Sequence, residues 1–193
     1  AKKNAEWPSD QRFFVPDDVR EHFLAMVEEG RLLEESWKKK LDAYREDFPE
    51  LAAEFERRMR GELPKDWAAA LPEFPANEKG MATRAASGKV LNALAERIPE
   101  LMGGSADLAP SNKTWIGKEL AFQPESPEGR NMHFGVREHA MGAIVNGMAA
   151  HGGLRPYGGT FLVFLDYMRG AVRLSALSEY PSIWVFTHDS IGV

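Results

Sequence analysis

The sequence predicts an α/β fold, a parallel sheet with helices on both faces, preceded by a helical segment. From residue 82 to residue 193, short apolar runs typical of strands alternate with stretches of helical periodicity. Residues 1–70 instead carry apolar side chains at helical spacing on otherwise charged stretches. Residues 71–81 hold two prolines and one glycine among polar residues, which indicates a linker. The predicted organisation is a helical tail of a preceding domain, a linker, and an α/β domain truncated at its C-terminal end.

The helical segment is predicted to contain three amphipathic helices. The acidic side chain of Asp17 favours a helix start, and Gly30 is expected to end that first helix. A second apolar stripe ends before Pro49, and a third ends at Gly61. Their charged outer faces indicate structural packing and no chemistry.

The α/β part is predicted to alternate strands and helices along its length. Thr83 is expected to cap the first helix, which ends before Pro99. In parallel sheets of this kind, functional residues gather in the loops that follow the strands. The expected elements are a helix from 83, strands at 100–105 and 131–134, a helix over 137–151, a strand and turn over 154–160, a helix over 161–178, and a strand at 182–187 that is buried on both faces.

Composition and charge argue against several classes of function. The net charge of −5 argues against a general nucleic-acid-binding protein, which would usually be basic. The absence of cysteine excludes disulfides, thiolate chemistry and zinc–sulfur sites. The first residues lack the apolar core of a signal peptide, and no apolar run approaches the roughly 18 residues of a membrane span. We therefore expect a cytoplasmic protein that acts neither on nucleic acid nor at a membrane.

The ends of the chain predict a fragment of a longer protein. The chain begins without methionine and stops at Val193, shortly after the last predicted strand. A domain rarely ends while its sheet is still being laid down, because the strand edge would stay unpaired.

Polar side chains occur at several of the positions where a parallel sheet places function. Loop 103–112 combines glycines with Asp107, Ser111 and Asn112, although a plain turn with an Asx cap explains it equally well. His188 follows the last strand, where a lone histidine is as often structural as functional. Arg84 lies in the first turn of its helix, where a cation opposes the helix dipole, and this favours an anion-binding role.

Glu138 stands at the start of a helix that is otherwise almost wholly apolar. One interpretation is that its carboxylate only complements the helix dipole, and the common occurrence of surface glutamates favours it. The functional interpretation places the carboxyl beside apolar Phe134, Met141 and Ile144. Desolvation there would favour its protonated form and let it share a proton with a bound base.

Three aromatic residues recur at a spacing of three. Phe161, Phe164 and Tyr167 are predicted to share one face of a helix. Such a stripe is usually core, and the alternative is a slot in which a flat heterocycle stacks.

Six stretches, taken in order, resemble the transketolase family. The resemblance covers essentially the whole chain, weakly in residues 1–70 and strongly from 82 onward, and six ordered stretches are far more specific than any single short motif. The stretches are ATR at 82–84, GGSADLAPSN at 103–112, GVREHAMGA at 135–143, GTFL at 159–162, AVRLSAL at 171–177 and THDSIG at 187–192.

The resemblance implies an activity, cofactors and partners for the parent protein. Members of the family transfer a two-carbon ketol unit from a ketose phosphate to an aldose phosphate, in the pentose phosphate pathway, using thiamin diphosphate and a divalent metal such as Mg²⁺ or Ca²⁺. The cofactor lies at a homodimer interface, with its diphosphate and metal on one subunit's N-terminal domain and its pyrimidine on the partner's second domain. Residues 82–193 resemble that second, pyrimidine-binding domain.

The resemblance also assigns roles to single residues near the cofactor. Glu138 matches the catalytic glutamate, which pairs with the pyrimidine ring nitrogen and so prepares the thiazolium carbon to become a nucleophile. Phe164 matches the residue that stacks on the pyrimidine, with Phe161 and Tyr167 as neighbours. Asp107 matches a residue near the cofactor.

A second set of residues matches groups that bind the sugar substrate, mainly its phosphate. These are Arg84, Ser111 and His188. An arginine, a hydroxyl and an imidazole that converge on a phosphate make chemical sense, because arginine offers a fixed fork of donors. The metal ligands and the diphosphate site of the family's N-terminal domain are absent from this sequence, so the chain is expected to be inactive alone.

Two alternatives differ in the class of function. One is a noncatalytic subunit that completes a separate diphosphate-binding chain. The other is a related ketol transferase with a different acceptor, such as formaldehyde. The pair Arg84 and Ser111 favours sugar phosphates. A plain α/β binding module would require all six stretches to be coincidental.

Overall fold

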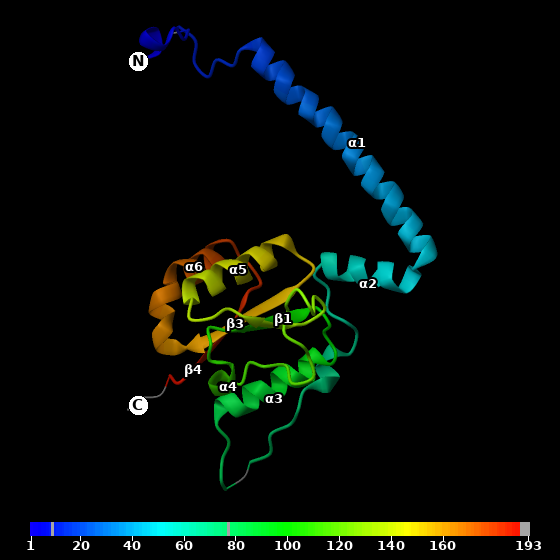
Figure 1. Cartoon of the computed structure of the whole chain (residues 1–193), viewed down its shortest axis with the longest axis vertical. Helices are drawn as coiled ribbons and strands as arrows, with labels where there is room; N and C mark the ends of the chain where they lie inside the picture. The colour runs from blue at the N-terminus through cyan, green and yellow to red at the C-terminus, as the bar shows by residue number, and fades with distance from the viewer. Residues whose placement is uncertain (9, 77, 190–193) are drawn as a thin grey trace. The chain divides into compact units, whose positions relative to one another are not determined.

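The computed structural model describes residues 1–8, 10–76 and 78–189, and Figure 1 shows their helices and strands in order. By compactness the chain divides into Ala1–Ala53 and Glu54–Val193. The domain boundaries expected from the sequence, at 70 and 82, stay predictions. None of the helices among the described residues combines the length and the apolar character that crossing a bilayer requires.

The first unit is mainly one long helix. It contains η1 (Lys2–Ala5), α1 (Asp17–Asp47) and the start of α2 (Pro49–Met59). The prediction that Gly30 ends the first helix was wrong, because α1 runs through it without interruption. A glycine within a helix costs only about 1 kcal/mol, and Arg31 pairs with Glu28 and Glu35 across that turn. α1 buries none of its residues.

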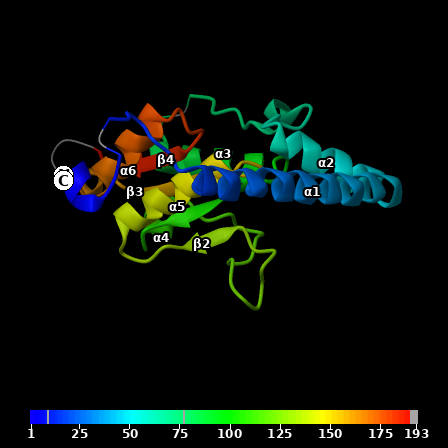
Figure 2. The ribbon, with the colours of Figure 1, turned by 90° about the horizontal axis from the view of Figure 1, so that it is seen from above.

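The second unit is built on a parallel sheet of four strands among the described residues. The strands are β1 (Leu101–Ser105), β2 (Asn131–His133), β3 (Arg155–Phe161) and β4 (Ile183–Thr187), in the spatial order β2-β1-β3-β4. Figure 2 shows β2 and β4 at opposite sides of the sheet. The register pairs Ser105 with both His133 and Gly159, and Phe161 with Thr187, so the carboxyl ends of all four strands lie at one edge.

Helices cover both faces of this sheet, as predicted. α3 (Thr83–Ala95) and α4 (Ala109–Asn112) lie on one face, and α5 (Glu138–His151) and α6 (Leu165–Leu177) lie on the other (Figure 1). The short helix η2 (Trp67–Ala70) packs on the first face through Trp67. A further turn, η3 (Leu162–Phe164), joins β3 to α6.

Each face has its own apolar core. The first contains Ala95, Ile98, Leu101, Ile116 and Tyr157. Burial raises the pKa of Tyr157, whose hydroxyl donates to the Thr114 carbonyl oxygen at 2.8 Å. The second core contains Ala106, Phe134, Met141, Val145 and Met168. The two cores fix α3 and α5 on opposite sides of the strands and thereby define the edge at which the loops meet.

Several local predictions need correction. Thr83 does not cap α3 with its side chain, because Ala82 is the N-cap residue. The strand predicted to end at 160 continues to Phe161, and the helix predicted from there begins only at Leu165. β4 is not buried on both faces: it is an edge of the described sheet, and Ile183 is 42% exposed.

A buried ion pair joins α2 to the amino end of β1. Arg57 donates to both carboxylate oxygens of Glu100, at 2.8 and 2.9 Å, and Glu100 is only 3% exposed. Arg57 also bonds Glu54, and this contact, with help from Arg58, lowers the pKa of Glu54 to about 2. The bidentate geometry satisfies a carboxylate that would otherwise be buried alone.

The contact between α5 and α6 gives a first prediction. A Cβ on Gly142 would lie 2.7 Å from the Cβ of Ala171, whereas a Cβ on Gly147 of the same helix would meet nothing within 4 Å. We expect Gly142→Ala to lower the free energy of unfolding by about 1–3 kcal/mol through overpacking. Gly147→Ala is the matched control, and it should raise stability by up to about 1 kcal/mol. Urea unfolding of both variants checks this, and equal effects would contradict it.

The buried ion pair gives a second prediction. Arg57→Met leaves the Glu100 carboxylate buried without its partner and should destabilise the chain by about 3 kcal/mol. The double variant Arg57→Met/Glu100→Leu should regain part of that loss. Arg60→Met is the control, because Arg60 pairs with Glu62 at the exposed surface, and it should change little. Thermal unfolding of the three variants tests the order, and a double variant no more stable than Arg57→Met would refute it.

Candidate active site

The residues predicted to carry chemistry lie at the carboxyl edge of the sheet. Asp107 follows β1, Glu138 begins the helix after β2, Phe161 ends β3, and His188 follows β4. They come together because all four strands run in the same direction. Arg84 reaches this edge from the first turn of α3.

Glu138 is a largely buried residue whose carboxyl has no partner among the described residues. Its residue is 7% exposed, and its side chain has no hydrogen bond or ion pair with any described residue. The neighbouring Arg137 donates instead to the Phe134 carbonyl oxygen at 3.2 Å. The carboxyl oxygens of Glu138 are not among the fully buried side-chain atoms that lack a partner, so solvent or a ligand can reach them.

The apolar surroundings predicted for Glu138 are present in part. Phe134 and Met141 belong to one buried core, and Met141 lies one turn after Glu138 on α5. Ile144 is 44% exposed, and its expected place beside the carboxyl stays a prediction. A helix exposes one side to solvent, and Ile144 falls on that side.

The three aromatic residues are neighbours, although they do not share a helix face. Phe161 ends β3, Phe164 ends η3 and Tyr167 lies in the first turn of α6. The Phe161 and Phe164 rings are stacked with centroids 5.7 Å apart, and the Phe164 and Tyr167 centroids are 5.9 Å apart. Tyr167 is 67% exposed, so the row opens to the surface and is not core.

The starts of α5 and α6 lie close together. Met141 and Met168 are fully buried in the same core, and Gly142 lets the two helices approach closely. Glu138 stands one turn before Met141, and Phe164 immediately precedes α6. The buried carboxyl and the aromatic row therefore belong to neighbouring helix starts, an arrangement suited to a flat heterocycle with a basic ring nitrogen.

A cleft of about 430 Å³ joins the start of α3 to the end of β4. Arg84, Ser87, Thr187 and His188 are among its lining residues. Arg84 Nη1 contacts His188 Nε2, and the His188 ring lies 4.0 Å from the Phe161 ring, measured between centroids. The structure thus brings together two of the three residues predicted to bind a phosphate.

Ser111 and Asp107 are not among the described residues that line this cleft. Ser111 is half-buried in α4, and Asp107 is exposed with a φ of 61°, in the left-handed region. Their predicted contacts with substrate and cofactor stay predictions. Ser190–Gly192, the end of the last resembling stretch, lie outside the described residues.

The sequence analysis named Asn112 only as one polar residue of loop 103–112, and it assigned no role to Thr187. Asn112 is fully buried and donates from Nδ2 to Thr187 Oγ1 at 2.7 Å, and Thr187 Oγ1 lies 2.9 Å from His188 Nδ1. Ser105 Oγ completes the set, 3.2 Å from Asn112 Oδ1. No pattern in the sequence signals a contact between residues 75 positions apart.

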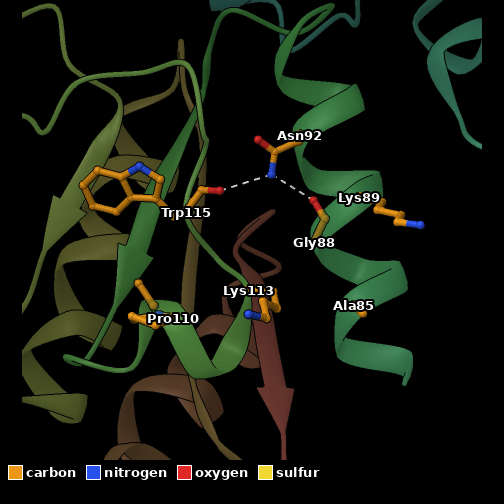
Figure 3. A pocket seen from close by; sticks show the side chains of 8 residues that line it. Ala85, Gly88, Lys89, Asn92, Pro110, Lys113 and Trp115 are labelled. Atoms are coloured by element: carbon orange, nitrogen blue, oxygen red, sulfur yellow. Dashed lines mark hydrogen bonds between the residues drawn. The ribbon is translucent and has the colours of Figure 1, made fainter. Parts of the chain in front are cut away.

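A second cavity, of about 460 Å³, lies between α3 and the segment that follows α4 (Figure 3). Its polar centre is Asn92, which donates to the carbonyl oxygens of Gly88 and Trp115 at 2.9 and 3.1 Å and accepts from the Gly117 amide. These hydrogen bonds use the capacity of the Asn92 amide. They attach the loop to α3 and leave no unpaired amide group for a ligand. Among the described residues, no cluster of three or more His, Asp, Glu or Cys side chains is suited to a metal ion.

Comparisons with known proteins agree with this geometry. Residues 79–193 match the family model "Transketolase, pyrimidine binding domain", and residues 1–64 match "Transketolase, thiamine diphosphate binding domain". Both models describe domains of enzymes that bind thiamine diphosphate. The α/β fold of this chain is the fold of that class of enzyme. The chain belongs to the transketolase family.

Individual relatives are similar over essentially the whole chain. Transketolases of Geobacillus stearothermophilus and Bacillus subtilis are 53% and 52% identical over all of it, and a chloroplastic transketolase of Arabidopsis thaliana is 51% identical. A transketolase structure from Pichia stipitis, in complex with sedoheptulose-7-phosphate, superposes with a TM-score of 0.91 at 45% identity over 99% of this chain. The chain spans 29% of the length of the two bacterial relatives and of that structure.

Proposed function

We propose that this chain is part of a transketolase that transfers a two-carbon ketol unit from a ketose phosphate to an aldose phosphate. The observation that carries the proposal is Glu138, a largely buried residue whose carboxyl has no partner among the described residues and which begins α5, the helix packed against α6 and its preceding aromatic row. The printed names of the relatives and the sugar phosphate in the Pichia stipitis structure support the substrate class.

The residues fit the pyrimidine ring of thiamine diphosphate. Phe164 offers a flat apolar face for the ring, with Phe161 and Tyr167 beside it. Glu138 offers a carboxyl to a ring nitrogen, and its burial strengthens that hydrogen bond. When bound, the cofactor supplies the carbon nucleophile that accepts the ketol unit. Glu138 acts in this proposal by holding a proton at the ring nitrogen.

The cleft of Arg84 and His188 supports a phosphorylated substrate. Arg84 brings a permanent cation and His188 a hydrogen-bonding ring to one wall of the cleft, beside the aromatic row. An acceptor such as formaldehyde has no anionic group for them. Ser111 is assigned to the same phosphate and Asp107 to the neighbourhood of the cofactor by the family resemblance.

The remaining parts of the proposal concern the parent protein. Residues 1–70 are assigned to the end of its diphosphate-binding domain, 71–81 to a linker and 82–193 to its pyrimidine domain. The parent protein is proposed to be a homodimer of the pentose phosphate pathway that binds Mg²⁺ or Ca²⁺ through a part outside this chain. Its cytoplasmic location stays a prediction.

Replacement of the buried carboxyl tests the proposal in the full-length protein. Glu138→Gln keeps the shape of the side chain and removes its acid function, so kcat for ketol transfer should fall at least about 100-fold. Cofactor affinity should fall less than about tenfold, because the aromatic face remains. Both quantities come from a coupled ketol-transfer assay and a fluorescence titration with thiamine diphosphate. Glu96→Gln, at an exposed ion pair with Lys118, is the control. A Glu138→Gln enzyme with kcat within twofold of wild type would reject the role.

The isolated chain gives a second test. We expect the purified 193-residue chain to show no ketol transfer above background at saturating thiamine diphosphate and Mg²⁺. The reason is that the diphosphate and metal are proposed to bind outside it. Circular dichroism on the same sample establishes that the chain is folded. Measurable turnover by a folded, pure chain would overturn this expectation.

A further inference from the structure

The orientation of His188 depends on buried groups behind it. Its backbone has a φ of 55°, in the left-handed region that a residue with a Cβ adopts at some cost. Its ring is held on one side by Thr187 Oγ1 and faces Arg84 on the other. Thr187 is 6% exposed and Asn112 is fully buried, so solvent does not replace their hydrogen bonds readily.

The contact with Arg84 fixes the tautomer of the imidazole. A guanidinium donates hydrogen bonds and cannot accept them, so His188 Nε2 is the acceptor in this contact. In a neutral ring the proton then resides on Nδ1, which donates to Thr187 Oγ1. Thr187 accepts a second hydrogen bond from Asn112 Nδ2 at 2.7 Å, and its two lone pairs accommodate both.

In a neutral imidazole, an anionic oxygen at the same position requires the opposite tautomer. An oxygen of a phosphate that takes the place of Arg84 at Nε2 accepts a hydrogen bond, so Nε2 must carry the proton. Nδ1 then needs a donor, and the hydroxyl proton of Thr187 supplies it while the bond from Asn112 stays in place. The imidazole loses a proton at Nδ1 and gains one at Nε2, so the exchange leaves the net charge of the ring unchanged.

We propose that Thr187, held by Asn112, is the positioning residue of His188: its hydroxyl accepts from the ring when Arg84 occupies Nε2 and donates to the ring when a substrate phosphate does. In this arrangement Arg84 and His188 bond each other in the free site and separate to share the anion. This inference rests on the proposed function, because the anion is taken to be the phosphate of the sugar substrate.

The test compares two buried threonines in the full-length protein. Thr187→Val removes the hydroxyl at nearly constant shape and should raise KM for an aldose phosphate about five- to tenfold, with kcat within about threefold. Thr187→Ser restores the hydroxyl and should return KM to within about twofold of wild type. Thr114→Val is the matched control, because the Thr114 hydroxyl is buried with no partner among the described residues. KM for glycolaldehyde, an acceptor without phosphate, should not change in any of these variants.

Arg84→Gln separates a failure of this inference from a failure of the proposed function. It should raise both KM for the aldose phosphate and the inhibition constant of inorganic phosphate. If Arg84→Gln changes neither, the phosphate site itself is refuted. If Arg84→Gln raises both and Thr187→Val raises neither, the role of Thr187 is refuted. An equal rise of KM for aldose phosphate and glycolaldehyde in Thr187→Val would also refute it. If Thr187→Val does not fold, Thr187→Cys, whose thiol is a weak hydrogen-bonding group, is judged by the same criteria.

Discussion

The parallel hydrogen-bond ladder of β1 is the constraint on which the site depends. β1 pairs with β2 on one side and with β3 on the other. The two registers place Ser105 opposite His133 of β2 and opposite Gly159 of β3. Because every strand runs in the same direction, each one delivers its following loop to the same edge. A shift of β1 by one residue in this register would turn Ser105 to the opposite face of the sheet and would move α4, with Asn112, relative to Thr187.

Glycines at close contacts allow neighbouring strands and neighbouring helices to approach one another near that edge. The carbonyl oxygen of Met132 lies 1.8 Å from where a Cβ of Gly104 would be, and Gly142 allows α6 to pack directly against α5. Larger side chains at these positions would separate β1 from β2 and α5 from α6. The close approach of α5 to α6 at Gly142 thus brings the helix that begins with Glu138 against the helix that follows the aromatic row.

Buried polar residues of the second unit differ in whether their hydrogen bonds are made within it. Asn131 donates to the carbonyl oxygens of Ile116 and Glu119 and accepts from the Ile116 amide, which fastens the long segment between α4 and β2. Its hydrogen-bonding capacity is used within the domain. Glu138 is nearly as well buried and has no such partner among the described residues. The hydrogen bonds of Asn131 are therefore made within the domain, whereas the Glu138 carboxyl is available to a ligand.

The sequence by itself determined the alternation of strands and helices from residue 82 onward, the parallel sheet and the candidate site residues. Periodicity and turn residues are local, so they sufficed for α5 and for the positions of β1 and β4 to within a residue. The tertiary structure decided what local patterns do not encode. α1 continues through Gly30, where no proline interrupts it. Phe161 belongs to β3 because it pairs with Thr187. β4 is half-buried because it lies at an edge of the described sheet. The contacts among Asn112, Thr187, His188 and Arg84 join residues far apart in the chain, and only the folded register brings their hydrogen-bonding groups together.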